Sequence, residues 1–174
     1  MNLELMALRW LLYERRCEIA LCERSPRSDW CGEPDVLGIT PARYMIEIEI
    51  KRSVSDFRAD SRKQSREPLF RQSYARRLPK QFYYLVPAAL VGRVQSEVPV
   101  WAGLMRGPSK GGYALEIIKD APINRESMRL SVKECCRMVR MVANWAMTKA
   151  ENLQASVLRF REGHWSWPQP DFEI

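Results

Sequence analysis

The sequence predicts an α/β domain whose elements follow in the order helix, strand, strand, strand, helix, strand, with a β-hairpin and a long helix after them. Three observations predict this class. Residues 43–51 alternate apolar and polar side chains as a half-buried strand does, and residues 81–87 form a short apolar run that a proline stops. Over about residues 125–153, apolar residues recur every three or four positions, which is the period of an amphipathic helix.

Length and composition limit the possibilities further. The 174 residues are close to the usual size of one domain. We expect a single domain over residues 1–155, with its core at about 3–87 and an irregular tail over 156–174. Hydrophobic residues make up 46% and charged residues 28% of the chain. This composition excludes disorder, collagen-like repeats and a coiled coil as descriptions of the whole chain.

The sequence also predicts a cytoplasmic protein without a membrane partner. No window approaches the roughly 18 uninterrupted apolar residues of a membrane helix. The N-terminal stretch lacks the small-residue cleavage site of a signal peptide. The five cysteines are odd in number and match no zinc-site spacing, so we expect reduced, mostly buried thiols.

Each element of the first part of the chain has a local signal. A buried first helix is predicted over residues 3–15, because leucines recur there on one helical face. Strand composition marks residues 17–23 and, after a polar stretch, residues 34–40. In the third strand, over 43–51, two sets of side chains point in opposite directions: Ile46, Ile48 and Ile50 on one face, and Glu47, Glu49 and Lys51 on the other.

The later elements are predicted in the same way. Ser53 or Ser55 can cap a helix that runs through DFRADSRKQ. The apolar run that ends at proline has the aromatic and β-branched composition of a buried strand. A short helix is expected over residues 88–98, and a hairpin over residues 100–106 and 113–119, across a glycine-rich turn.

The excess positive charge lies in one stretch. Residues 51–80 contain ten basic and three acidic side chains, whereas the rest of the chain contains 18 of each, so this stretch carries the whole net charge of +7. Such a patch attracts polyanions, and phosphate contacts are the usual source of sequence-independent affinity for nucleic acid. An anionic membrane surface and a solvated surface without a ligand are the alternatives. The candidate contacts are Arg52, Arg58, Arg62, Lys63, Arg66, Arg71, Arg76 and Arg77.

Three polar residues, Asp35, Glu49 and Lys51, fall on neighbouring strands. If the second and third strands form a hairpin that turns at Pro41–Ala42, the paired positions sum to about 84 and Asp35 lies opposite Glu49. Opposed residues have Cβ atoms about 4.5–5.5 Å apart on one face of the sheet. Two carboxylates at that spacing repel each other unless a cation neutralises them. Lys51 supplies one positive charge, and a divalent metal ion would supply the rest.

This arrangement suits phosphodiester hydrolysis. Mg²⁺ prefers one or two carboxylates, keeps several waters and leaves positions for phosphate oxygens. The ion polarises the phosphate and generates hydroxide from a bound water. A nearby lysine can orient or deprotonate that water and offset charge in the transition state. In a second interpretation, Glu47, Glu49 and Lys51 are only the solvated face of an amphipathic strand.

These residues also carry a resemblance to a known family. The order PD…EIEIK on adjacent strands, followed by a basic helix, resembles the PD-(D/E)XK nuclease superfamily. Within it, EIKRSVSDFRADSRKQ followed by QFYYLVP is similar to the MmcB-type and phage-encoded nuclease-like DNA repair proteins. The resemblance is specific over about residues 34–87 and looser over 3–33. It implies a restriction-endonuclease-like αβββαβ core with a central mixed sheet.

By position, the resemblance implies a role for each residue of the motif. Asp35 and Glu49 become metal ligands, together with the backbone carbonyl of Ile50, and Lys51 becomes the catalytic lysine. The implied cofactor is Mg²⁺ or Mn²⁺.

Other acids near the motif are assigned less directly. A glutamate on the first helix often completes such sites; Glu14 is the candidate for a catalytic and metal-binding role, and Glu23 is the second choice. Glu47 is an additional acid on the same strand face that the motif does not require. Asp56 and Asp60 lie in the matching helix and are interpreted as helix-surface or capping residues.

Two functions follow. The first is a metal-dependent nuclease that hydrolyses phosphodiester bonds of DNA, with RNA left open as a substrate. The second is a catalytically silent DNA-binding or repair-accessory protein with the same fold, and a more distant third is a structural protein with a solvated acidic face. The intact Asp/Glu/Lys set favours the first, because a protein that only binds DNA gains nothing from two buried acids near phosphate. A homo-oligomer is possible but is not predicted.

Overall fold

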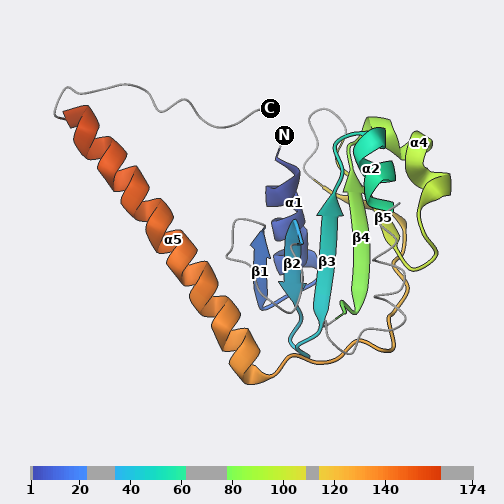
Figure 1. The fold of residues 1–174 in the computed structure, drawn as a ribbon, viewed down its shortest axis with the longest axis horizontal. Coiled ribbons are helices and arrows are strands. Elements are labelled where there is room, and N and C mark those ends of the chain that lie inside the picture. The colour runs from blue at the N-terminus through green and yellow to red at the C-terminus, as the bar shows by residue number, and fades with distance from the viewer. Residues whose placement is uncertain (1, 23–33, 62–77, 109–113, 162–174) are drawn as a thin grey trace.

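The protein is an α/β domain built on one mixed sheet (Figure 1). The structure, a computed structural model, describes residues 2–22, 34–61, 78–108 and 114–161. Six strands follow one another across the sheet in chain order. The first three are antiparallel neighbours, the third to fifth are parallel, and the last two are antiparallel. The strands are β1 (Ile19–Cys22), β2 (Val36–Ile39), β3 (Met45–Ile50), β4 (Gln81–Val86), β5 (Gly103–Arg106) and β6 (Glu116–Lys119).

The register of the β2–β3 hairpin is the predicted one. Val36 pairs with Ile48 and Ile39 pairs with Met45, so that paired positions sum to 84. The turn is closed by the Thr40 backbone N–H, which donates to the Tyr44 carbonyl at 2.9 Å. The hairpin of β5 and β6 is also confirmed, and both of its strands belong to the same sheet as the others.

Both faces of the central strands are covered. Helix α1 (Leu3–Arg9) continues into a π-helical segment, η1 (Trp10–Glu14), and packs on the face that carries the β3 isoleucines. Helix α2 (Val54–Ser61) packs on the opposite face through Phe57, whose ring lies 4.9 Å from that of Tyr84. The acidic face of β3 is therefore an interior face at its carboxyl end, and the interpretation of that face as solvated is wrong there.

The segment after β4 forms the predicted short helix. It consists of two 3₁₀ turns, η2 (Ala88–Leu90) and η3 (Gln95–Glu97), on either side of helix α4 (Val91–Val94). Val94 is fully buried in the same cluster as Phe57. Helices α2 and α4 thus cover one end of the sheet together (Figure 1).

The long last helix, α5 (Val132–Arg161), differs from its predicted bounds at both ends. It starts later than residue 125, because Ser131 and Glu134 form a reciprocal N-terminal cap: the Glu134 N–H donates to Ser131 Oγ, and the Ser131 N–H donates to Glu134 Oε2. It ends later as well, inside the segment expected to be an irregular tail. Met138 packs against the sheet, and beyond it Figure 1 shows α5 extending away from the sheet. No described helix is long and apolar enough to span a bilayer.

Candidate active site

Asp35 lies at the carboxyl end of β3, where β2 begins. Its carboxylate Oδ2 accepts the backbone N–H of Ile50 at 2.6 Å. The preceding residue, Pro34, has no N–H to donate to a ladder, so the backbone pairing of β2 stops here. The aspartate side chain thus takes the place of a backbone acceptor and is held against the strand residue between Glu49 and Lys51.

Glu49 and Lys51 form a buried ion pair beside Asp35. The Lys51 Nζ lies 2.8 Å from Glu49 Oε1, and the two residues are 5% and 7% exposed, respectively. The Lys51 backbone N–H donates to the Leu85 carbonyl at 3.0 Å, which fixes the lysine at the end of the β3–β4 ladder. Charged residues this deeply buried are rare unless they are paired.

Helix α2 adds two acids to this pair. The Lys51 Nζ lies 3.4 Å from Asp60 Oδ1 and 3.9 Å from Asp56 Oδ1. Asp60 is 1% exposed and accepts a hydrogen bond from the Tyr84 hydroxyl at 3.0 Å, so its interpretation as a helix-surface residue is wrong. Asp56 is exposed and accepts the Arg52 backbone N–H. The four-residue spacing of the two aspartates places them on one helical face, and this was the available sequence signal.

The start of α2 is fixed by the predicted cap. Ser53 Oγ accepts the backbone N–H of Asp56 at 3.1 Å, and the Ser53 and Ser55 hydroxyls are hydrogen bonded at 2.9 Å. Because the cap sets where the helix begins, it also sets which side chains face the sheet one and two turns later. Of the two serines proposed as caps, Ser53 is therefore the one that performs this role.

The electrostatics of the cluster keep Lys51 charged. Burial by itself lowers the pKa of Lys51, but the hydrogen bond to Glu49 and the charges of Glu49, Asp60 and Asp56 outweigh burial and raise the pKa above its usual range. Asp35 adds a fourth carboxylate to the same end of β3. Three carboxylates around the Lys51 ammonium group, together with that of Asp35, give the site a formal charge of −3, which suits a cationic ligand.

Glu14 is not brought to this site. It is an exposed residue at the end of η1, and its neighbour Arg15 donates a hydrogen bond to Gln81. Gln81 pairs with Ile46 of β3. Ile46 lies four residues, or about 13 Å, before Ile50 along the strand. The helix also lies on the sheet face opposite Glu49. Glu23, the second choice, is outside the described residues.

The acid that α1 does bring to this end of the sheet is Glu4. Its carboxylate lies 2.6 Å from the guanidinium of Arg52, the residue that follows Lys51. The sequence did not reveal which end of α1 would lie near the motif.

Glu47, the additional acid of β3, lies two residues before Glu49. It is half-buried and pairs with Leu37 of β2.

The predicted nucleic-acid contacts are described only in part. Arg52 and Arg58 are exposed, and each forms an ion pair at 2.6 Å, with Glu4 and Glu97 respectively. The hydrogen bond to Glu97 raises the pKa of Arg58. The other predicted contacts lie outside the described residues: Arg62, Lys63, Arg66, Arg71, Arg76 and Arg77.

Two further sequence expectations concern cysteines and metals. Of the five cysteines, the four described ones are free thiols, and burial raises the pKa of Cys17 to about 11. Cys31 lies outside the described residues. Within the described part of the chain, no group of three or more histidine, cysteine, aspartate or glutamate side chains is arranged to hold a metal ion.

Comparison with known proteins gives one similar solved structure. It is the SPO1766 protein of unknown function from Silicibacter pomeroyi, which is 24% identical and matches 86% of this chain and 84% of its own, with a TM-score of 0.44. No protein-family model matches the chain, and no curated protein matches it.

Proposed function

We propose that this protein is a Mg²⁺- or Mn²⁺-dependent deoxyribonuclease with a restriction-endonuclease-like fold. One observation carries the proposal: Asp35, Glu49 and Lys51 meet at the carboxyl end of β3, with the aspartate against the strand backbone and the other two in a buried pair. Burying the ionisable groups of Glu49 and Lys51 beside a partly buried Asp35 is costly for a structural purpose alone. The predicted αβββαβ order of the first elements also agrees with this fold.

The residues present fit a partly hydrated divalent ion. Asp35 and Glu49 each offer carboxylate oxygens, and a carboxylate has about four lone-pair positions, more than one hydrogen bond uses. In a strand, the N–H and C=O of one residue point toward the same neighbour. The Ile50 N–H donates to Asp35, so the Ile50 carbonyl is directed to the same side. Two carboxylates, one carbonyl and several waters are a ligand set that Mg²⁺ accepts.

Each protein group then has a distinct task. A bound Mg²⁺ supplies polarisation of the scissile phosphate and a water of lowered pKa. Lys51, whose raised pKa keeps it cationic, donates hydrogen bonds and offsets the negative charge that develops on the phosphate oxygens. Glu49 holds the lysine in place at 2.8 Å. A cationic Lys51 has no lone pair for a proton, so we assign it charge stabilisation rather than general-base catalysis.

One observation favours the alternative, a catalytically silent DNA-binding protein. Lys51 is shared by Glu49, Asp60 and Asp56, and Asp60 is in turn bonded to Tyr84. This network joins α2 to two strands and has a structural role whether or not a metal ion binds. A silent protein would bind DNA without cleaving it in the presence of either metal ion.

A supercoiled-plasmid assay with Mg²⁺ or Mn²⁺ separates the two functions. Asp35→Asn retains an oxygen that can accept the Ile50 N–H but loses the charge, so we expect cleavage to be lost and the fold to be kept. Glu47→Gln is the matched control, because it also exchanges a carboxylate for an amide, on β3, at a residue that is not one of the three acids paired with Lys51. Wild-type protein that binds the plasmid but leaves it intact with both ions would refute the nuclease and support the silent protein.

A further inference from the structure

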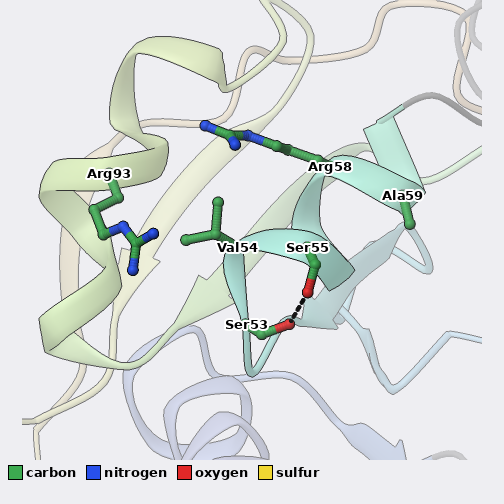
Figure 2. Close-up of a pocket in the computed structure, with 6 residues that line it drawn as sticks. All are labelled: Ser53, Val54, Ser55, Arg58, Ala59 and Arg93. Carbon is green, nitrogen blue, oxygen red and sulfur yellow. Dashed lines mark hydrogen bonds between the residues drawn. The ribbon is translucent and has the colours of Figure 1, made fainter.

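A cavity of about 560 Å³ lies between helices α2 and α4, next to the candidate active site (Figure 2). Ser53, the first residue of its lining, follows Lys51 by two positions, so the Cα atoms of these two residues are at most about 7 Å apart. Of the residues that line it, none is acidic: they are Ser53, Val54, Ser55, Arg58, Ala59 and Arg93. The cavity thus differs in charge from the acidic cluster beside it.

Two arginines from different helices line this cavity. Figure 2 shows the guanidinium groups of Arg58, from α2, and Arg93, from α4, extending into the space between the helices. Arg58 is held in a two-pronged pair with Glu97, through Nε at 2.9 Å and Nη2 at 2.6 Å. Arg93 is exposed and has no ion pair with a described acid. Glu97 neutralises the positive charge of Arg58. The net positive charge at the cavity is therefore that of Arg93.

Hydroxyl groups and the start of α2 complete the polar wall. The Ser53 and Ser55 hydroxyls lie 2.9 Å apart in the same cavity and can each donate or accept a hydrogen bond. Both belong to the first turn of α2 or its cap, where the helix dipole favours an anion. Val54 and Ala59 add apolar surface. Arginine guanidinium groups together with hydroxyl donors are the groups that recognise phosphate.

We infer that this cavity binds a phosphate group of the DNA strand, beside the bond that is cleaved at Asp35, Glu49 and Lys51. The inference rests on the proposed function and names where the strand is held. The volume is well above that of one phosphate and within the roughly 300–1,000 Å³ of small-molecule sites, so an attached sugar also fits. The phosphate is either an internal diester or a terminal monoester, which share this chemistry.

The test is DNA binding without cleavage. A duplex oligonucleotide with an internal fluorescein is titrated with protein in EDTA at several salt concentrations, and anisotropy gives the dissociation constants. Each phosphate contact contributes about 0.9 to the slope of log K against log salt. Arg93→Ala should reduce the magnitude of that slope by about 0.9. Arg125→Ala is the matched control, since it removes an exposed arginine near the opposite end of β4, and it should leave the slope unchanged.

Three duplexes distinguish the sources of the phosphate: one unphosphorylated, one with 5′-phosphates and one with 3′-phosphates. A terminal site predicts tighter binding of one phosphorylated duplex, and loss of that preference in Arg93→Ala. An internal site predicts equal binding of all three with the same fall in slope.

The inference is overturned if Arg93→Ala leaves the salt slope unchanged, or if Arg125→Ala reduces the slope as much as Arg93→Ala does. Wild-type protein that binds none of the duplexes also overturns it. Because binding is measured without metal, the inference and the proposed nuclease fail separately. Intact plasmid with an Arg93-dependent slope refutes only the nuclease, and cleaved plasmid with an unchanged slope refutes only the phosphate site.

Discussion

The Lys51 network makes a quantitative prediction about stability. Replacing Lys51 with Met keeps a long apolar stem but removes the ammonium group that lies 2.8 Å from Glu49 and 3.4 Å from Asp60. Both acids are more than nine-tenths buried. Removing one partner of a buried ion pair costs about 3–5 kcal/mol, because the remaining charge stays in a poor solvent. For a chain of this length, that corresponds to a fall in melting temperature of about 6–20 °C.

The pH dependence of the loss identifies its cause. In wild-type protein the raised pKa of Lys51 adds stability below the ordinary lysine pKa of about 10.4, and that stability is lost as the pH rises through the folded-state value. In Lys51→Met the buried carboxylates favour their protonated forms, so lowering the pH relieves the penalty. The stability difference between the two proteins should therefore be largest near pH 8 and shrink toward pH 5.

Urea denaturation followed by circular dichroism at pH 5 and pH 8 measures both effects. Lys133→Met is the matched control, because Lys133 is an exposed residue of α5, and its exchange should change stability by no more than about 0.5 kcal/mol. A loss below about 1 kcal/mol for Lys51→Met, equal at both pH values, would show that the ammonium group does not pair with buried carboxylates in solution.

Three further predictions concern packing, capping and metal binding. A Cβ on Gly103 would lie 2.5 Å from the Tyr83 ring, so Gly103→Ala should cost about 1–3 kcal/mol in urea denaturation, whereas Gly92→Ala, with open space around it, should be neutral or stabilising. Ser131→Ala removes the cap of α5 and should cost about 1 kcal/mol in the same assay. With Mg²⁺ at 100 times its dissociation constant, wild-type protein should gain about 2.7 kcal/mol in a thermal melt, and Asp35→Asn should gain nothing; an equal gain in both would remove Asp35 from the metal site.

The hairpin register was predictable from the sequence for a physical reason. Side chains alternate along a strand with a period of two, so slipping the pairing by one residue would turn every isoleucine of β3 to the other face. The turn at Pro41–Ala42 then leaves one pairing, in which Val36 meets Ile48. Local patterns settle such a question, because the strands are adjacent in sequence and only four or six residues long.

The burial of the acidic strand face was not predictable in the same way. Alternation along β3 is identical whether the second face meets water or a helix. What decides between them is the packing of Phe57 and Asp60 from α2, residues that the fold brings onto β3 and β4. The direction of α1 is a similar case: Glu4 and Glu14 are both helix acids, and only the tertiary fold places Glu4 near the motif.

The charge distribution links the candidate site to the basic stretch. Among the described residues of this stretch, Lys51, Arg52 and Arg58 are each paired with an acid, so these three add little net attraction for DNA. Residues 62–80 contain seven basic side chains and one acid, so by sequence most of the excess positive charge of the basic stretch lies there. The site itself, with four carboxylates and the one ammonium group of Lys51, has a formal charge of −3 and repels phosphate. On the proposed function, basic residues bring the strand close, and a bound cation is what allows a phosphate to enter the acidic end of β3.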